Sequence, residues 1–423
     1  MRNKVLILSY YFEEELIGSI RSQGLAKYLP RFGWDPVILT HGDTGSKSKY
    51  SGITEYVQSD DMFSLWRKKL GIEHNKIIRP YLKLPNKHRS FVDWIIGLWD
   101  EIFLFPDAQK NWIHPAKEKA RELASRDKFD AIISTAFPVS SHIIARYLKT
   151  EFEIPWVADF RDLWSQYAYY HYSPLRRFAD ICLEIWTLSK ADAITTVSTP
   201  LALKLRQIHG KKRIEVIMNG FDPELLNHHQ KLSHDKFNIV YTGQLYKGKM
   251  DPMLLFQCIS NLVRKGIIDE NKIEIQFYGH IPEWLVRDIE KMRLNGIIRL
   301  NGPVDREIAL QKQREAQLLL LLSWNDPKEP GILTGKLFEY LAAKRPIISI
   351  GPETSEIKNI LESTKAGVHL TNDEEIKEYI IKKYSEFNTA GQIEYHGISE
   401  QINKYSHIEM AKRFASILDE IAK

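Results

Sequence analysis

Residues 238–250 read NIVYTGQLYKGKM, and this stretch decides the fold. A short apolar run ends at Gly243, and a helical pattern follows it. A run that is apolar on both faces and precedes a helix is typical of a strand in a parallel, doubly wound sheet. Ligands of such sheets bind at the carboxyl ends of the strands, where glycine lets a backbone approach closely. The stretch therefore indicates an α/β fold with a binding loop after Gly243.

The same unit recurs along the chain in both directions. The runs are KVLILSYY, PVILT, AIIST, PWVAD, AITTVS and EVIMNG, then NIVYTG, IEIQFYG, IRLNG, LLLLLS and PIISIG. Eleven strands are too many for one ordinary open sheet, and the series pauses between Gly220 and Phe237. We therefore expect one domain at residues 1–220 and a second at 221–400. Within residues 401–423, a capping box beginning at Ser406 predicts a terminal helix.

Composition excludes several classes of protein. The chain has 423 residues, 43% hydrophobic and 27% charged, which is ordinary for a globular protein and unlike disordered or fibrous ones. Its net charge of +5 is too small at this length to indicate a nucleic-acid partner. The two cysteines, Cys182 and Cys258, lie in apolar helical patterns and suggest a reducing compartment. No apolar window approaches the roughly 20 residues that span a bilayer, so we expect a cytoplasmic protein.

One segment concentrates positive charge. Residues 64–92 hold eight Lys or Arg and a single acid, Glu73, a net charge of +7, while the rest of the chain sums to −2. The aromatic stretch FVDWIIGLWDEIFLF follows directly. Residues 64–105 therefore predict contact with an anionic membrane surface or a phosphorylated lipid, at the inner face of the cell membrane. A solvated surface beside a buried helix is the alternative.

The first candidate for chemistry is the loop from Gly243 to Lys249. It fits the pattern G-x4-G-K, but Met250 stands where a nucleotide-binding P-loop has the hydroxyl that binds Mg²⁺. Glycines after a strand, a lysine and a helix N-terminus can nonetheless cradle a diphosphate. The alternative is an ordinary strand-to-helix turn.

The second candidate is EPGILTGKLFEYL, residues 329–341. Its glycines expose backbone N–H groups, and a helix is expected to start near Thr334. Lys336 and Glu339 are three residues apart and so share one face of that helix. A lysine can hold a phosphate while a carboxylate accepts ribose hydroxyls. A surface salt bridge between the two residues is the alternative.

The first domain offers two further loops. Gly18 and Ser19 follow the first apolar run and would let a phosphate or sugar approach a helix start. The motif DFRDLW places Asp159, Arg161 and Asp162 just beyond a strand end, where active-site loops lie. An internal ion pair of Arg161 is the alternative. The chain has no G-x-G-x-x-G after its first strand and no G-x-S-x-G, which argues against nicotinamide enzymes and serine hydrolases.

In their order and spacing these stretches resemble the family 4 glycosyltransferases, which are retaining enzymes of the GT-B fold. The matching stretches are KVLILSYYF to PVILT, DFRDLW, ITTVSTPLALKL, VIMNGFD, VYTGQLYKGKMDP and GKLFEYLAAKRPII. The resemblance covers essentially the whole chain. It implies two Rossmann-like, doubly wound domains facing a cleft, with the donor held mainly by the second domain and the acceptor mainly by the first. It also implies that the final helix returns to the first domain.

The resemblance assigns residues by position. Lys249 corresponds to the lysine that contacts the donor diphosphate, and Glu339 to the glutamate that binds the nucleotide ribose. The other donor residues that it implies are Gly18, Ser19, Gly243, Gln244, Gly331, Ile332, Leu333, Thr334 and Lys336. Two positions depart from the family: Gln244 stands where arginine is frequent, and Gly331 stands where a second glutamate is usual.

The implied reaction is retaining transfer of a hexose from a nucleoside-diphosphate sugar to a hydroxyl of a glycan acceptor. The basic, aromatic segment suggests a lipid-linked acceptor, and the resemblance implies the bacterial or archaeal surface-polysaccharide type. Lys249 would stabilise the leaving diphosphate with no metal or cofactor. Asp162 would orient the acceptor, together with Asp159 and Arg161. The alternatives are a UDP-sugar epimerase on the same fold and an inactive subunit that binds nucleotide sugars.

Overall fold

The computed structural model describes residues 2–13, 17–43, 50, 52–60, 101–170, 172–227, 235–329 and 332–423. It divides into two compact units. Unit 1 comprises Met1–Met218 and Met410–Lys423, and unit 2 comprises Asn219–Glu409. Each unit is a parallel sheet with helices, so the predicted α/β fold with two Rossmann-like domains is confirmed. Most of the basic, aromatic segment predicted to meet a membrane lies outside the described residues.

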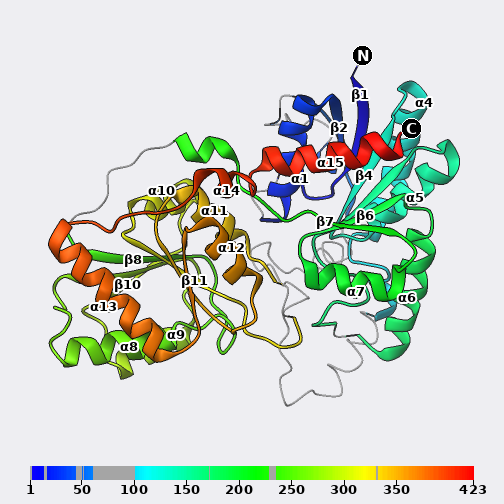
Figure 1. The fold of residues 1–423 in the computed structure, drawn as a ribbon. Coiled ribbons are helices and arrows are strands. Elements are labelled where there is room, and N and C mark those ends of the chain that lie inside the picture. The colour runs from blue at the N-terminus through cyan, green and yellow to red at the C-terminus, as the bar shows by residue number, and fades with distance from the viewer. Residues whose placement is uncertain are drawn as a thin grey trace. The chain divides into compact units, whose positions relative to one another are not determined.

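Unit 1 is built on a seven-stranded parallel sheet with the order β3-β2-β1-β4-β5-β6-β7 (Figure 1). Its strands are β1 (Asn3–Leu8), β2 (Trp34–His41), β3 (Ile53–Val57), β4 (Ala131–Ala136), β5 (Trp156–Phe160), β6 (Ala193–Thr196) and β7 (Arg213–Val216). Its helices are α1 (Ile17–Tyr28), η1 (Leu29–Phe32), η3 (Lys110–Trp112), α4 (Ile113–Arg126), α5 (Ser140–Phe152), α6 (Pro174–Leu188) and α7 (Thr199–His209). The strand order reverses between β1 and β4, so the loops after these two strands flank the switch point, where ligands of such sheets bind.

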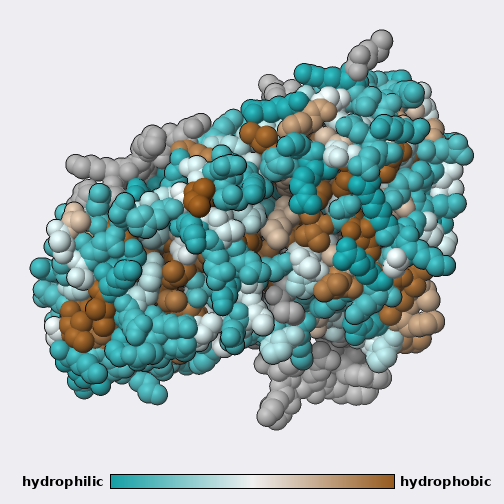
Figure 2. Space-filling model, in the orientation of Figure 1, coloured by the Kyte–Doolittle hydropathy of each residue, from teal (hydrophilic) through white to brown (hydrophobic). Residues whose placement is uncertain are grey.

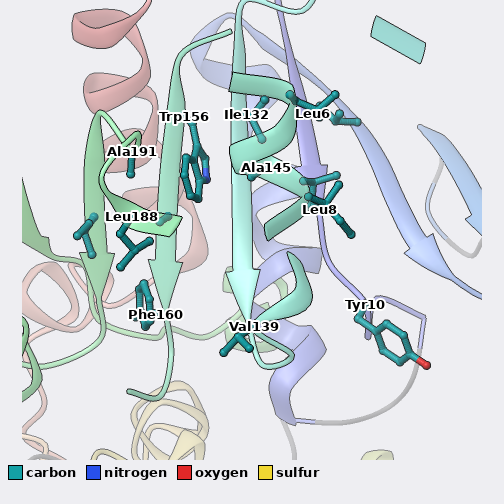
Figure 3. Close-up of a cluster of buried hydrophobic side chains, with 14 of the residues drawn as sticks. Leu6, Leu8, Tyr10, Ile132, Val139, Ala145, Trp156, Phe160, Leu188 and Ala191 are labelled. Carbon is teal, nitrogen blue, oxygen red and sulfur yellow. The ribbon is translucent and has the colours of Figure 1, made fainter. Parts of the chain in front are cut away.

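The core of unit 1 explains why these runs form central strands. Leu6 and Leu8 of β1 lie beside Ile132 of β4 and Trp156 of β5, and all four are fully buried (Figure 3). Ala145 of α5 packs against them from one face of the sheet. Because both faces of these strands are covered, most residues in them are apolar.

Unit 2 has a six-stranded parallel sheet with the order β10-β9-β8-β11-β12-β13. Its strands are β8 (Phe237–Thr242), β9 (Ile273–Tyr278), β10 (Ile298–Gly302), β11 (Leu318–Leu322), β12 (Ile347–Ile350) and β13 (Gly367–Leu370). Its helices are η4 (Pro223–Asn227), α8 (Met253–Arg264), α9 (Glu283–Lys291), α10 (Arg306–Glu315), α11 (Gly335–Ala343), α12 (Glu356–Thr364), α13 (Asp373–Ala390) and α14 (Ser399–Asn403). The switch point lies between β8 and β11, the strands that precede the two motifs predicted to bind phosphate.

The final helix, α15 (His407–Ile421), begins in unit 2, and from Met410 onward it belongs to unit 1. The Ser406 hydroxyl accepts a hydrogen bond from the backbone N–H of Glu409 at 3.3 Å, as in a capping box. Within unit 1, the Trp34 indole donates to the Asp419 carboxylate at 2.8 Å. The return of the chain thus closes unit 1 with a segment far from it in sequence.

Candidate functional site

The loop after β8 brings a backbone unusually close to a lysine. Gly243 has a φ of +114°, and its N–H donates to the Tyr278 carbonyl at 2.7 Å. A Cβ at Gly243 would lie 2.3 Å from Cε of Lys336. Only glycine therefore allows both the turn and the position of the lysine side chain.

Lys336 lies in the first turn of α11 and reaches back to the end of β8. Its Nζ donates to the Tyr241 hydroxyl at 2.7 Å and to the Gln244 carbonyl at 3.3 Å. Burial lowers the pKa of Lys336 to about 7, although the nearby Glu339 carboxylate acts to raise it. Both hydrogen-bond acceptors are neutral, so a cation held here would be stabilised by an anionic ligand.

The start of α11 presents unsatisfied polar groups. Thr334 occupies the N-cap position, but its side chain makes no capping hydrogen bond. Its Oγ1 is buried and has no hydrogen-bond partner among the described residues. The first N–H groups of a helix have no intrahelical acceptor, and the helix dipole favours negative charge at this end. The arrangement suits a phosphate or a ligand hydroxyl.

Glu339 is held one turn further along α11. Its Oε1 lies 3.0 Å from Nη2 of Arg306, and its Oε2 accepts from Nε2 of Gln313 at 3.4 Å. Gln313 in turn donates to the Thr242 hydroxyl at 2.9 Å. The alternative interpretation of this motif, a salt bridge between Lys336 and Glu339, is absent from the described ion pairs, and Glu339 pairs with Arg306 instead.

Sequence reasoning missed Arg306, which is the first residue of α10. The signal was available, because Arg306 follows closely on the strand run IRLNG and so lies at the carboxyl edge of the sheet. It places a second cation beside α11.

Lys249, the residue assigned to the diphosphate, is anchored on the loop after β11. Its Nζ lies 2.9 Å from Oδ2 of Asp326 and 5.1 Å from the centre of the Trp324 ring. The side chain is 24% exposed, so it does not extend into bulk solvent. The Lys249 ammonium is therefore already paired with the Asp326 carboxylate, whereas both hydrogen-bond acceptors of Lys336 are neutral.

Gln244 connects the two lysines. Its carbonyl accepts from Lys336, and its Oε1 accepts from the Tyr246 hydroxyl at 2.7 Å. The Tyr246 ring packs edge-on against Trp324, beneath Lys249. The structure thus groups Gly243, Gln244 and both lysines around one set of aromatic rings. Of the other residues of the second motif, Leu333 is buried and Ile332 is half-buried, whereas Gly331 lies outside the described residues.

In unit 1 the structure joins Gly18 to Arg161. The Gly18 carbonyl accepts from Nη1 of Arg161, and a Cβ at Gly18 would lie 2.3 Å from that nitrogen. Arg161 also donates to the carbonyls of Ala136, at 2.7 Å, and Phe137, at 3.0 Å. Arg161 therefore binds backbone carbonyls in the first turn of α1 and at the carboxyl end of β4. Ser19 is buried, and its hydroxyl lies 3.4 Å from Nε2 of Gln23.

Asp159 differs from the expectation that it contacts an acceptor. It is fully buried, and Nε and Nη2 of Arg21 donate to its two carboxylate oxygens at 2.9 Å each. The Thr195 hydroxyl donates to the same carboxylate at 2.7 Å. Burial acts to raise the pKa of Asp159, but Arg21 lowers it below its ordinary value. The internal ion pair of this loop is thus Arg21–Asp159, while Asp162 is exposed.

A sequence model of the family described as Glycosyltransferase Family 4 matches residues 21–225. No curated protein matches the chain in sequence. The family match supports glycosyltransferase activity.

Solved structures share the fold over nearly the whole chain. Sucrose-phosphate synthase from Thermosynechococcus elongatus is 11% identical, with 99% of each chain covered and a TM-score of 0.61. HepE from Anabaena, in complex with UDP, is 12% identical, with 99% of this chain and 100% of HepE covered and a TM-score of 0.61. The N-terminal domain of trehalose-6-phosphate phosphatase from Candida albicans is 11% identical, with 100% of this chain and 97% of that domain covered and a TM-score of 0.66. HepE has also been solved with UDP-glucose.

Proposed function

We propose that the chain is a retaining glycosyltransferase that moves a hexose from a nucleoside-diphosphate sugar to a hydroxyl of a lipid-linked glycan in surface-polysaccharide synthesis. The observation that carries the proposal is the start of α11. There the Thr334 hydroxyl, which has no hydrogen-bond partner among the described residues, and the Lys336 ammonium lie beside a helix N-terminus. The match of residues 21–225 to glycosyltransferase family 4 agrees with it.

The donor would be held by unit 2. The N–H groups of α11, with Thr334 and Lys336, suit the diphosphate, and Glu339 suits the ribose hydroxyls. Arg306 also pairs with that carboxylate. The backbone of residues 331–333 would border the hexose. The complexes of HepE with UDP and UDP-glucose make uridine nucleotides the first donors to test.

Charge that develops on the leaving diphosphate must be stabilised as the glycosidic bond breaks. Lys336 and Lys249, together with the helix amides, would supply this as a preorganised electrostatic effect of roughly several kcal/mol. In the proposed retaining reaction the acceptor attacks the face that the leaving group departs from, and a phosphate oxygen takes the acceptor proton. No protein base is then required. Asp162, the exposed carboxylate after β5, would orient the acceptor hydroxyl.

Nucleotide release tests the proposal. The protein is incubated with UDP-, GDP-, ADP- or dTDP-sugars and a polyprenyl-linked saccharide, and the anomeric configuration of the product is determined. We expect acceptor-dependent release of a nucleoside diphosphate with retention, and a loss of kcat of about 100-fold in Lys249→Ala. An isomerised sugar nucleotide formed without acceptor would identify an epimerase. Binding without turnover of any donor would identify an inactive subunit.

A further inference from the structure

Helix α6 of unit 1 turns an apolar face outward. Leu175 is 79% exposed, Phe178 65%, Ile185 45% and Trp186 53%. These residues recur at helical spacing and form one stripe, with exposed Cys182 at its centre. Apolar side chains reach the surface of unit 1 in the region that Figure 1 labels α6 and α7 (Figure 2). This pattern is the reverse of that expected for a surface helix of a soluble protein.

The opposite, charged face of α6 is buried and fixes the rotation of the helix. Asp180 accepts from Nε of Arg176 at 2.9 Å and from the Trp164 indole at 3.1 Å. Glu184 accepts from the backbone N–H of Ser165 at 3.0 Å. Turning the helix to bury its apolar stripe would break these bonds and leave buried charges without partners, at a cost of several kcal/mol. The stripe is therefore held outward by the fold.

The segment before α6 extends the apolar surface. Glu101 accepts from the backbone N–H of Ser173 at 2.8 Å, which places residues 101–104 at the start of α6. Next to this contact, Ile102 is 71% exposed. We call Ile102, Leu175, Phe178, Cys182, Ile185 and Trp186 the α6 face.

Cations border the α6 face. The Arg146 guanidinium lies 3.7 Å from the centre of the Trp186 ring. Lys190, two residues beyond the helix, is exposed. The two acids of α6, Asp180 and Glu184, are buried, so the helix exposes no negative charge.

We propose that the α6 face docks onto an anionic lipid bilayer, with its apolar side chains in the headgroup region and its bordering cations on lipid phosphates. Tryptophan and phenylalanine beside basic residues are what such an interface favours. A second copy of the chain fits less well, because a two-fold contact through this face would bring like-charged borders together. No helix in the described part of the chain has the length and apolarity that a membrane span requires. The inference deepens the proposed lipid-linked acceptor.

Cys182 provides a direct probe. The other cysteine, Cys258, is 2% exposed and burial raises its pKa to about 12, so a maleimide dye at neutral pH labels Cys182 selectively. Vesicles of phosphatidylglycerol and phosphatidylcholine in equal parts should shift the emission of an NBD label to the blue, and nitroxide-labelled lipid should quench it. Pure phosphatidylcholine vesicles should give a much smaller shift. No shift with the anionic vesicles would overturn the proposal, as would a shift that follows protein concentration alone and accompanies dimer formation.

Vesicle flotation of unlabelled variants provides a second test. Phe178→Asp combined with Trp186→Asp should weaken binding to the anionic vesicles by about tenfold or more. The matched control is Ile267→Asp with Ile308→Asp, which replaces two residues of unit 2 that are 43% and 42% exposed and adds the same charge. Equal losses in both variants would refute the assignment to α6. Because neither donor nor acceptor is present, failure here leaves the transferase test unaffected.

Discussion

The Lys336 ammonium lies 2.7 Å from the Tyr241 hydroxyl and 4.5 Å from the centre of the same ring. The phenol and the ring offer partial negative charge but no counter-ion. Burial accordingly lowers the pKa of Lys336 to about 7, far below the ordinary value of a lysine. A bound diphosphate would provide the missing negative charge and raise that pKa again.

UDP binding should therefore take up a proton at pH 8. In the free protein Lys336 is then mostly neutral, and in the complex it is protonated. Calorimetry in buffers of different ionisation enthalpy should detect uptake of up to about one proton per nucleotide. As the pH rises above 7, binding should weaken, because protonating Lys336 becomes more costly.

Matched substitutions assign the proton to one lysine. Lys336→Met should bind UDP more weakly and without the uptake. Lys249→Met should retain the uptake, because Lys249 already faces the Asp326 carboxylate. Tight binding by the unmodified protein at pH 8 with no proton uptake would contradict the position proposed for the diphosphate.

Gly243→Ala should disturb both stability and binding. The added Cβ would meet Cε of Lys336 at 2.3 Å, and the φ of +114° is strained for any other residue. We expect a loss of about 1–3 kcal/mol in the free energy of unfolding and a marked fall in UDP affinity.

Gly266→Ala is the control for backbone strain alone. Gly266 has a φ of +69°, and a Cβ there would have no heavy atom within 4 Å. Its melting temperature should fall slightly while UDP affinity stays the same. If Gly243→Ala bound UDP as tightly as the unmodified protein, UDP binding would not depend on the observed position of the Lys336 side chain.

Most of the described strands could be predicted from sequence, and two of the four edge strands could not. The eleven runs singled out above lie in the strands or directly beside them, because a strand covered on both faces must be apolar. The two missed strands, β3 and β13, are at sheet edges. β3 buries only Val57, and β13 buries no residue, so neither leaves an apolar run to recognise.

The residues of the candidate site also differ in how well the sequence predicts them. Glycines and lysines beside strand ends were found because local sequence fixes where a strand stops. The partners of charged residues were not, because they depend on contacts between distant segments. Arg21 and Asp159 are 138 residues apart, and Arg306 and Glu339 come from different helices. No spacing rule predicts such pairs.

Asp159→Asn should destabilise unit 1. It would weaken the buried pair with Arg21 and leave that guanidinium without its counter-ion, at a cost of about 3–5 kcal/mol in the free energy of unfolding. The lowered pKa of Asp159 also predicts how stability depends on pH. The charged carboxylate contributes fully to the free energy of unfolding at neutral pH, and this contribution is lost as the pH falls below the ordinary carboxylate range.

Asp162→Asn separates structure from catalysis. Asp162 is exposed, so its substitution should leave the melting temperature within about 2 °C of the original. Turnover with acceptor should fall if Asp162 orients it. If Asp159→Asn were stable and had lost only acceptor-dependent turnover, we would conclude that Asp159 orients the glycan acceptor.

Thr334→Val should separate ligand binding from stability most cleanly. The threonine hydroxyl is buried without a hydrogen-bond partner among the described residues, so the folded protein bears the cost of its desolvation. An isosteric valine removes that cost, and chemical unfolding should show equal or slightly greater stability. A hydrogen bond from this hydroxyl to a charged phosphate would contribute about 1.5–3 kcal/mol, so UDP affinity should fall by roughly tenfold or more.

Thr242→Val is the matched control, because it removes the same group from a site where the hydroxyl is used. Thr242 accepts from Gln313 at 2.9 Å, so valine should cost about 1–3 kcal/mol of stability. The two threonines should thus respond in opposite directions. If Thr334→Val instead destabilised the protein and left UDP affinity unchanged, the Thr334 hydroxyl would stabilise the fold. The proposal that the phosphate binds at the start of α11 would then be wrong.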